Sequence, residues 1–217
     1  MATEHPILFS APMIRALLNG TKSQTRRKVK LNDAGHVAKG GRQWHVDDPA
    51  VICASPYGSR GDQLWVRETW GMSYIDKLET GRPFVPGGTW GSPSRPNRPS
   101  CVVFRADGPM PDDSPAETAR WSPSIHMPRW ASRITLEITG VRVERLNSIS
   151  NADAISEGVE ALDGELAGVY ACGPAASGTT AAECYRRLWG SINGTESWAL
   201  NPLVWVVSFN VKANHHS

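Results

Sequence analysis

Two segments in which apolar residues recur at every second position restrict the fold of this chain more than any other feature. The pattern runs through residues 134–143 and returns near the end at residues 203–211. Successive side chains of a β-strand point to opposite faces, so this period predicts strands with one buried face. Only short helical patterns separate the predicted strands, and no β-α-β rhythm is present. We therefore expect an α+β protein whose strands form a small closed or partly closed barrel.

Shorter segments complete the predicted architecture. Apolar and β-branched runs predict further strands at residues 6–9, 63–70 and 102–105. Helices are expected where a capping or first-turn residue precedes an apolar face. They run from Pro12 to just before Gly20, from Ser150 through Glu157, and from Thr180 across Cys184, Tyr185, Leu188 and Trp189.

Three polar or proline-rich segments interrupt this pattern, at about residues 31–60, 71–130 and 160–179. Ten of the 16 prolines lie between Pro83 and Pro128, which makes the second segment too long for an ordinary connection. It is expected to be either a functional lid or a packed irregular excursion. With no linker that separates two folding units, the 217 residues are interpreted as a single domain with insertions.

Composition bounds the class of protein. Apolar residues make up 40% and charged residues 20% of the chain, as in soluble globular proteins. No apolar run approaches the ~20 residues of a membrane span, and the N-terminus lacks the regions of a signal peptide, so a cytoplasmic monomer is the default expectation. The four cysteines and six histidines show no metal-binding spacing, and neither a metal nor a cofactor is expected.

A basic segment after the first helix is the richest in chemistry. Lys22 is followed by Thr25, Arg26 and Arg27, and no acidic residue occurs between Glu4 and Asp33. The cluster suits an anion, or a lysine beside a nucleophilic hydroxyl. A solvated basic face that complements the helix dipole is the plainer interpretation. The net charge of +2 is too small to indicate nucleic acid by itself.

Other candidates lie further along the chain. Arg67 and Glu68 point to opposite faces of their strand, so one of them faces inward or into a cleft. A second group interleaves basic and aromatic side chains, as in sites for a nucleobase and its phosphate. This group comprises His126, Arg129 and Trp130, with Trp65 as another ring that can stack on a base. Lone surface charges and packed tryptophans explain these residues nearly as well.

The ordered motifs resemble the ASCH family. They are the segment Leu17–Arg27 with its G-x-K-x-x-T-x-R pattern, the Gly61-Asp62 strand, the strands at 134–143, the helix carrying Glu157, and the last strand. Together they cover about a third of the chain. Residues 189–194, with Trp198 and Asn201-Pro202, resemble the longer phage and prophage members. The resemblance implies a PUA-like β-barrel.

The same resemblance implies several activities. Small bacterial members remove the acetyl group from N(4)-acetylcytidine, using a lysine, a threonine three residues later, and a glutamate on a later helix. These correspond to Lys22, Thr25 and Glu157, and Arg27 matches an arginine of the motif. Other members are ribonucleases or RNA binders, and fold resemblance does not choose among them.

Three functions therefore stay open. In the first, Lys22 activates Thr25, which attacks the acyl carbon of an N(4)-acylated cytidine, while Glu157 holds Lys22 or the leaving amine. The substrate would lie against some of the remaining candidates, which are Arg26, Arg27, Trp65, Glu68, His126, Arg129 and Trp130. In the second, Lys22 and the arginines clamp a phosphate of RNA for a ribonuclease. In the third, the protein binds RNA or modified nucleic acid without catalysis.

Overall fold

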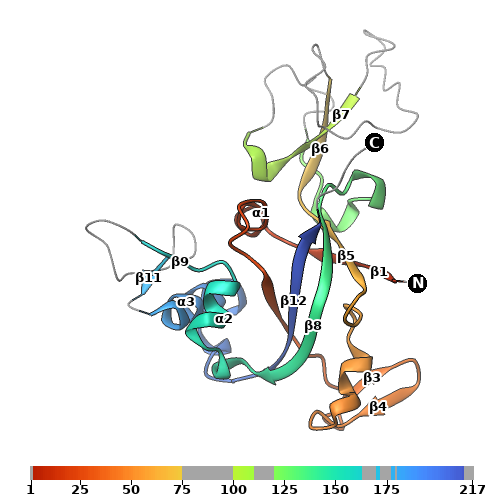
Figure 1. The fold of residues 1–217 in the computed structure, drawn as a ribbon, viewed down its shortest axis with the longest axis vertical. Coiled ribbons are helices and arrows are strands. Elements are labelled where there is room, and N and C mark those ends of the chain that lie inside the picture. Colours follow the sequence, from red (N-terminus) through yellow and green to blue (C-terminus); the bar gives the residue numbers. More distant parts are fainter. Residues whose placement is uncertain are drawn as a thin grey trace. The chain divides into compact units, whose positions relative to one another are not determined.

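The computed structural model describes residues 2–74, 100–109, 120–162, 170–171, 177–178 and 180–212. These residues form a mixed α+β protein with a mainly sheet core and few short helices (Figure 1). The α+β class expected from the sequence is thus confirmed. None of the helices in these ranges is both long enough and apolar enough to cross a membrane.

The main sheet has five strands in the order β1-β5-β8-β12-β2. Their bounds are β1 Glu4–Leu8, β5 Gln63–Arg67, β8 Thr135–Arg145, β12 Leu203–Lys212 and β2 Gln24–Lys28. Strands β12 and β2 are antiparallel, with Val207 opposite Thr25. Because β1 and β2 end this order, the sheet is open, and a closed barrel is not found among the described strands.

Smaller elements surround this sheet. Two hairpins pair β3 (Val37–Lys39) with β4 (Arg42–Trp44) and β6 (Trp70–Tyr74) with β7 (Ser100–Phe104). A three-stranded sheet contains β9 (Glu160–Ala161), β10 (Tyr170–Ala171) and β11 (Ser177–Gly178). Residues 31–60, interpreted as loop, thus contain a hairpin and a 3-10 helix at Pro49–Ala54. Strands of three residues are too short to show a period in the sequence.

The helices lie in the segments where the sequence predicts them. They are α1 (Ala11–Leu18), α2 (Asn151–Ser156) and α3 (Ala181–Asn193). The Ser150 hydroxyl accepts the Asp153 N–H at 3.0 Å, and the Thr180 hydroxyl accepts the Glu183 N–H at 3.1 Å. These caps satisfy donors that have no partner within the helix. After α1 the chain turns at Gly20, whose φ of +76° favours glycine.

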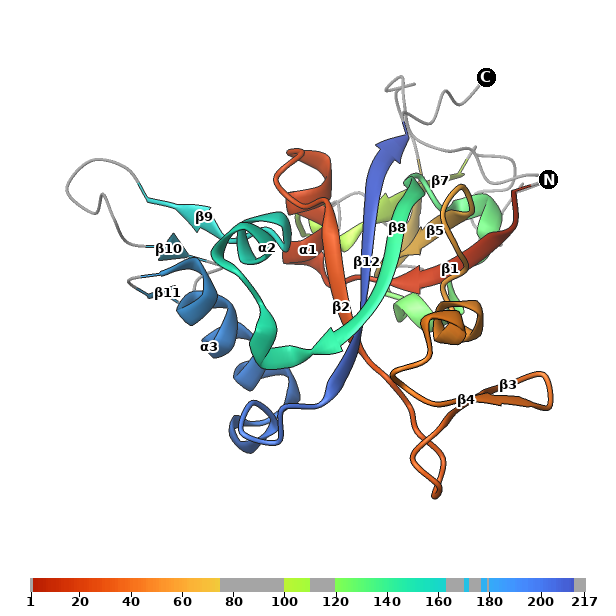
Figure 2. The same cartoon turned by 60° about the horizontal axis from the view of Figure 1, so that its bottom comes forward.

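The chain divides into two compact units, each formed by separate stretches of sequence. Unit 1 contains Met1–His5, Ala16–Leu64 and Leu136–Val211, and unit 2 contains Pro6–Arg15, Trp65–Thr135 and Lys212–Ser217. In unit 1, the buried Val204 and Val206 of β12 pack in one cluster with residues of α2 and α3, which lie side by side in Figures 1 and 2. The core of unit 2 is Trp70, Val102, Phe104, Met127 and Ala131.

Strand β12 differs from its prediction at both ends. Val211, expected on the buried face, is 41% exposed. Trp205, Val207 and Phe209 are buried as expected, but Val204 and Val206 on the other face are buried as well. The helices of unit 1 cover that second face. A strand buried on both faces reads as a continuous apolar run rather than as an alternation, and Leu203–Val207 is such a run.

Candidate functional site

A buried ion pair between Lys22 and Glu157 forms the centre of the candidate site. The Lys22 ammonium donates to the Glu157 backbone carbonyl at 2.8 Å and to its Oε2 at 2.9 Å. Lys22 is 2% exposed and Glu157 8%. The backbones of the two residues also form an isolated antiparallel bridge, and the Ser23 N–H donates to the Ser156 carbonyl at 2.9 Å. The end of α2 is thus fixed to the entry of β2 through both main chain and side chain.

Gly158 allows this close approach. Glu157 is the C-cap of α2, and Gly158 follows with a φ of +98°. A Cβ at position 158 would lie 3.3 Å from the Ala16 Cβ and 3.5 Å from the Lys22 Cβ. Any side chain here would strain the backbone and crowd the Ala16 Cβ, while its contact with Lys22 would be of ordinary length. The glycine that closes the helix in the sequence therefore also lets the chain pass close to Ala16.

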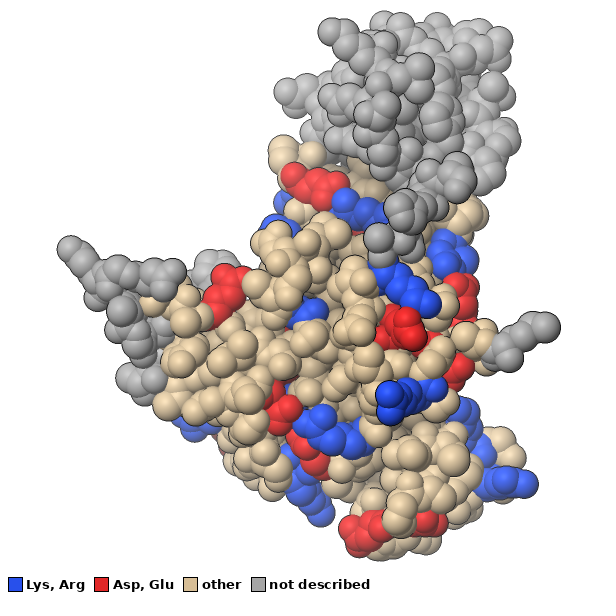
Figure 3. All heavy atoms as spheres, in the orientation of Figure 1, with Lys and Arg blue, Asp and Glu red and all other residues tan. Residues whose placement is uncertain are grey.

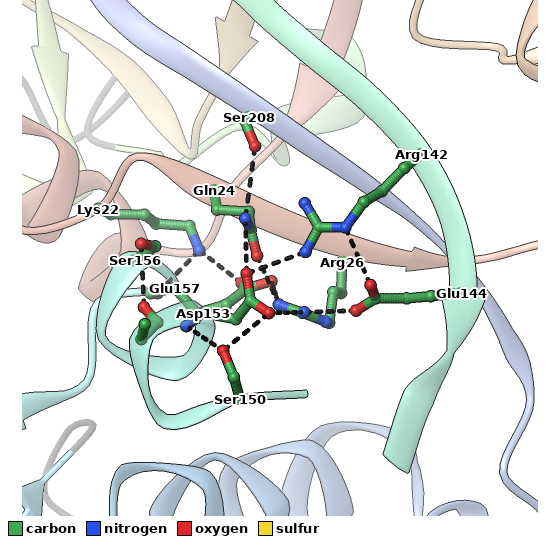
Figure 4. Close-up of polar contacts among 11 residues, drawn as sticks. Lys22, Gln24, Arg26, Arg142, Glu144, Ser150, Asp153, Ser156, Glu157 and Ser208 are labelled. Carbon is green, nitrogen blue, oxygen red and sulfur yellow. Dashed lines mark hydrogen bonds and ion pairs between the residues drawn. The ribbon is translucent and has the colours of Figure 1, made fainter. Parts of the chain in front are cut away.

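Arg26 lies beneath the ion pair with no side-chain surface exposed. Its guanidinium contacts Glu157 Oε1 at 3.3 Å, Glu144 Oε1 at 2.6 Å and Asp153 Oδ2 at 3.2 Å. It also donates to Gln24 Oε1 at 2.6 Å. These partners come from β8, α2 and β2, and they converge on the guanidinium in Figure 4. Arg26, expected from the sequence to contact substrate, thus occupies an interior position.

Arg142 extends the network toward solvent. Its guanidinium contacts Glu144 and Asp153, each at 2.9 Å. The Gln24 amide donates to Asp153 at 3.1 Å and to the Ser208 hydroxyl at 3.3 Å. Burial alone would raise the pKa of Asp153, but hydrogen bonds from Gln24, Arg142 and Ser150 and the charge of Arg26 lower it to about 2. Asp153 therefore remains ionised beside its two arginines.

Lys22 holds its proton less tightly than an ordinary lysine. Burial lowers its pKa from 10.5, because a low-dielectric interior disfavours the ammonium. The charge and the hydrogen bond of Glu157 act in the opposite direction, and Arg27 and Arg26 lower the pKa further. The net effect is downward. A neutral lysine amine is the form that can accept a proton from a nucleophile.

Thr25 has a different environment from Lys22 and Glu157. It is 1% exposed and lies within β2 between Gln24 and Arg26. Both of those side chains join the network on the α2 side. Alternation along the strand places Thr25, with Arg27, on the opposite face. The structure thus brings Lys22 and Glu157 together and puts the predicted nucleophile on the other side of the strand.

Tyr57 is a residue near the Arg27 charge that sequence analysis missed. Burial raises the pKa of Tyr57, and the positive charge of Arg27 partly offsets that shift. Tyr57 stands in a Pro-Tyr-Gly turn, which gives no sign of its tertiary neighbours. The network partners of Lys22 had a clearer signal. Polar residues recur at 22, 24 and 26, and acidic residues stand four apart on α2 at 153 and 157.

The other predicted contacts belong to unit 2. Glu68, the inward-facing residue of its pair, is 2% exposed and bound by Arg133 at 2.9 and 3.0 Å. Trp65 is half-buried beneath the Arg67 guanidinium, and Arg129 donates to Thr135 at 3.4 Å. The 41% exposed Trp130 packs edge-on against Trp70, and His126 is also exposed. The lid expected from residues 71–130, with His126, Arg129 or Trp130 bordering the Lys22 site, stays a prediction. Residues 75–99 and 110–119 of that segment lie outside the described residues.

The described residues contain no cluster of three or more His, Cys, Asp or Glu that could hold a metal ion. Comparison with protein-family models, with curated proteins and with solved structures finds no match for this chain.

Proposed function

We propose that this protein is an amidohydrolase of the ASCH type, with a PUA-like fold, that removes the acyl group from N(4)-acylated cytosine nucleosides. The observation that carries the proposal is the buried Lys22, hydrogen-bonded to Glu157 and with its pKa lowered by burial. Lysines with lowered pKa values are typical general bases. The match of Lys22, Thr25 and Glu157 to the family motif supplies the substrate class.

The hydrogen bonds of Lys22 suit a group that gives and takes a proton. A neutral amine keeps two N–H groups, which are enough for the Glu157 carbonyl and carboxylate. Its lone pair accepts the proton of the attacking hydroxyl. The new O–C bond forms at the acyl carbon, the C–N bond to the cytosine breaks, and Lys22 passes the proton to the departing N4 amine. If the acyl group is on the protein, water then releases it as a carboxylic acid.

The attacking oxygen belongs either to Thr25 or to a water held by Lys22. The family motif favours Thr25, whereas strand alternation turns its side chain away from the Gln24 and Arg26 face. For Thr25 to react, the Lys22 amine must reach its hydroxyl directly or through one water. Mutation of Thr25 separates the two routes, because a water mechanism survives the loss of the hydroxyl.

A small substrate fits the charges better than a long RNA. Affinity for RNA depends mainly on phosphate contacts from accessible lysines and arginines. Lys22 and Arg26 are 2% and 3% exposed and already face carboxylates. Figure 3 shows basic and acidic side chains intermixed on the face that it draws. This argues against Lys22 as a phosphate clamp and thus against the ribonuclease.

A non-catalytic reader of modified nucleic acid is the second candidate. It is favoured by the pairing of Lys22, Arg26 and Glu157 with one another, as in an ion network that only joins a helix to a sheet. In that case the protein binds cytidine derivatives without turning them over. Activity on a defined substrate distinguishes the two.

The test is hydrolysis of N(4)-acetylcytidine, with release of cytidine followed by chromatography. Lys22→Met removes the base and is expected to lower kcat by roughly 10²–10⁴-fold, while Lys30→Met, at an exposed lysine of the same segment, serves as the matched control. Thr25→Ala should match Lys22→Met if Thr25 is the nucleophile, because such residues act as one unit. No hydrolysis by the wild-type protein, with cytidine derivatives still bound, would favour the reader instead.

A further inference from the structure

The polar network around Lys22 has balanced charges. Among the described residues, its ion pairs connect three carboxylates with three cations. The carboxylates are those of Glu144, Asp153 and Glu157, and the cations are those of Lys22, Arg26 and Arg142. Buried charges are stable only when they are paired and hydrogen-bonded. When Lys22 gives up its proton, the network acquires one net negative charge. The remaining cations must then hold that charge in the interior.

Glu157 is arranged for this change, because its two oxygens face different cations. Oε2 accepts from Lys22 at 2.9 Å, and Oε1 lies 3.3 Å from Arg26. Arginine stays protonated in proteins, whereas a buried lysine readily loses its proton. When Lys22 is neutral, the Glu157 carboxylate therefore still faces a full positive charge.

Arg26 is itself held in place from two other elements. Glu144 on β8 and Asp153 on α2 bind its Nη2 at 2.6 and 3.2 Å, and Gln24 accepts from its Nη1 at 2.6 Å. A guanidinium fixed at several points cannot follow Glu157 if that side chain moves. It keeps the carboxylate, and with it the Lys22 amine, in one geometry. Figure 4 shows Arg26 between these partners.

We propose that Arg26 is a positioning residue for Lys22: anchored by Glu144 and Asp153, it keeps the Glu157 carboxylate paired and in place while Lys22 releases and regains its proton. The role rests on the proposed function, in which Lys22 is the base. It gives Arg26 a part in the reaction without contact with substrate. It also explains why a site for a neutral lysine contains three carboxylates.

The proposal fixes the sign of one measurable change. The groups that act on Lys22 are Glu157 from α2 and Arg26 and Arg27 from β2, with Asp153, Glu144 and Arg142 behind them. Loss of the Arg26 charge removes the second cation that faces the Glu157 carboxylate. That carboxylate then interacts more strongly with Lys22, which favours the ammonium form of the lysine. Arg26→Gln should thus raise the Lys22 pKa. Arg26→Lys keeps the charge but loses the anchored guanidinium fork, so it should also raise the Lys22 pKa, by less than Arg26→Gln does.

The experiment is NMR titration of Lys22 in protein carrying ¹³C,¹⁵N-lysine, with the Lys22 signal assigned by its absence in Lys22→Met. It needs no substrate. Wild type, Arg26→Gln, Arg26→Lys and Arg142→Gln are compared, and Arg142→Gln should shift Lys22 less because Arg142 does not contact Glu157. An upward shift in Arg26→Gln that exceeds both others supports the positioning role. If that variant does not fold, a clear upward shift in Arg26→Lys, where the charge is present but the anchored fork is lost, supports it too.

An unchanged Lys22 titration in a folded Arg26→Gln variant, or in Arg26→Lys if only that variant folds, would overturn the proposal. The proposed function is checked separately by hydrolysis of N(4)-acetylcytidine. In an active enzyme, the acid limb of the pH profile of kcat should move upward with the Lys22 pKa in Arg26→Gln. Reduced but measurable activity at every pH, with an unshifted acid limb, would indicate a merely structural role and would also overturn the positioning role. An inactive wild type with a shifted Lys22 titration would reject the amidohydrolase and keep the electrostatic coupling.

Discussion

Among the residues that the structure describes, each unit buries one glutamate beside a cation, and the two pairs differ in the kind of cation. In unit 2, Glu68 is 2% exposed and both of its oxygens bind the Arg133 guanidinium, at 2.9 and 3.0 Å. In unit 1, Glu157 is 8% exposed and faces a lysine on one oxygen and an arginine on the other. An arginine cannot give up its proton in a protein, whereas a buried lysine can.

The surroundings of the two pairs also favour a permanent charge on Arg133 and a titratable one on Lys22. Arg133 is fixed by Glu68, by Asp107 at 2.8 and 2.9 Å, and by the Phe104 ring 3.9 Å beneath it. Burial alone would lower the pKa of Arg133, but its hydrogen bonds to Glu68 and Asp107 raise it, so that pair is a permanent ion pair. Burial lowers the pKa of Lys22 despite Glu157. Similar burial thus yields a fixed structural contact in one unit and a titratable one in the other.

The largest expected difference is in stability. Arg133→Met leaves Glu68 charged and buried, and we expect a loss of about 3 kcal/mol in the free energy of unfolding. Arg142→Met is the matched control, because its side chain is 43% exposed and such pairs contribute at most about 1 kcal/mol. Urea denaturation with an unchanged m-value measures both. Equal losses in the two variants would show that burial of Glu68 does not determine the strength of its pair.

The next expected effect is smaller and is the change in the free energy of unfolding with pH. The pKa of Asp153 is lowered to about 2, so its stabilisation is complete above 3.8 and is lost as the pH falls toward 2. Burial raises the pKa of Glu68 above 4.5, although Arg133 opposes the shift. Wild type should therefore gain stability relative to Glu68→Gln as the pH falls toward 4.5. It should lose stability relative to Asp153→Asn between about 3.8 and 2.

Denaturant unfolding across this pH range measures both slopes in the same protein. Slopes of the same sign for the two carboxyl groups would contradict the assignment of Glu68 to a desolvated site and of Asp153 to a hydrogen-bonded one.

The smallest expected effect is at an exposed ion pair, and it is the reference for the two buried pairs. Arg187 contacts Glu183 one turn away on α3 at 2.8 Å, with 51% of the arginine side chain exposed. Solvent and salt weaken such a pair, so Arg187→Ala should cost less than about 0.5 kcal/mol. Thermal melting at low and high salt is sufficient to measure it. A loss as large as that of Arg133→Met would mean that the chain is sensitive to any charge change.

Much of the fold followed from local patterns. The caps at Ser150 and Thr180 and the strand containing Val102 and Val103 are where the sequence places them, because each depends on residues close in the chain. The sequence did not decide between a closed and a partly closed barrel, since strand order depends on pairings between distant segments. A closed barrel is not found among the described strands. The β3–β4 hairpin was missed because each of its strands has three residues.

The candidate site was likewise predictable only in part. The family pattern identified Lys22 and Glu157, which are 135 residues apart and share a hydrogen bond. The burial of Arg26 was not foreseen, since a run of basic residues usually lies in solvent. Its position depends on Glu144 and Asp153, which no local pattern connects to it. The spacing of Lys22 and Thr25 in the sequence also gives no sign of which way Thr25 points. Alternation within β2 places its side chain on the face opposite to Gln24 and Arg26.

The Lys22 pKa in the wild-type protein tests the central distinction most directly. Lys22 is proposed to be a base that exchanges a proton, unlike Arg133, which remains charged. NMR titration of the ¹³C,¹⁵N-lysine signals should show Lys22 titrating clearly below 10.5. A Lys22 pKa at or above 10.5 would make the Lys22–Glu157 pair as permanent as the Glu68–Arg133 pair, and would contradict the account.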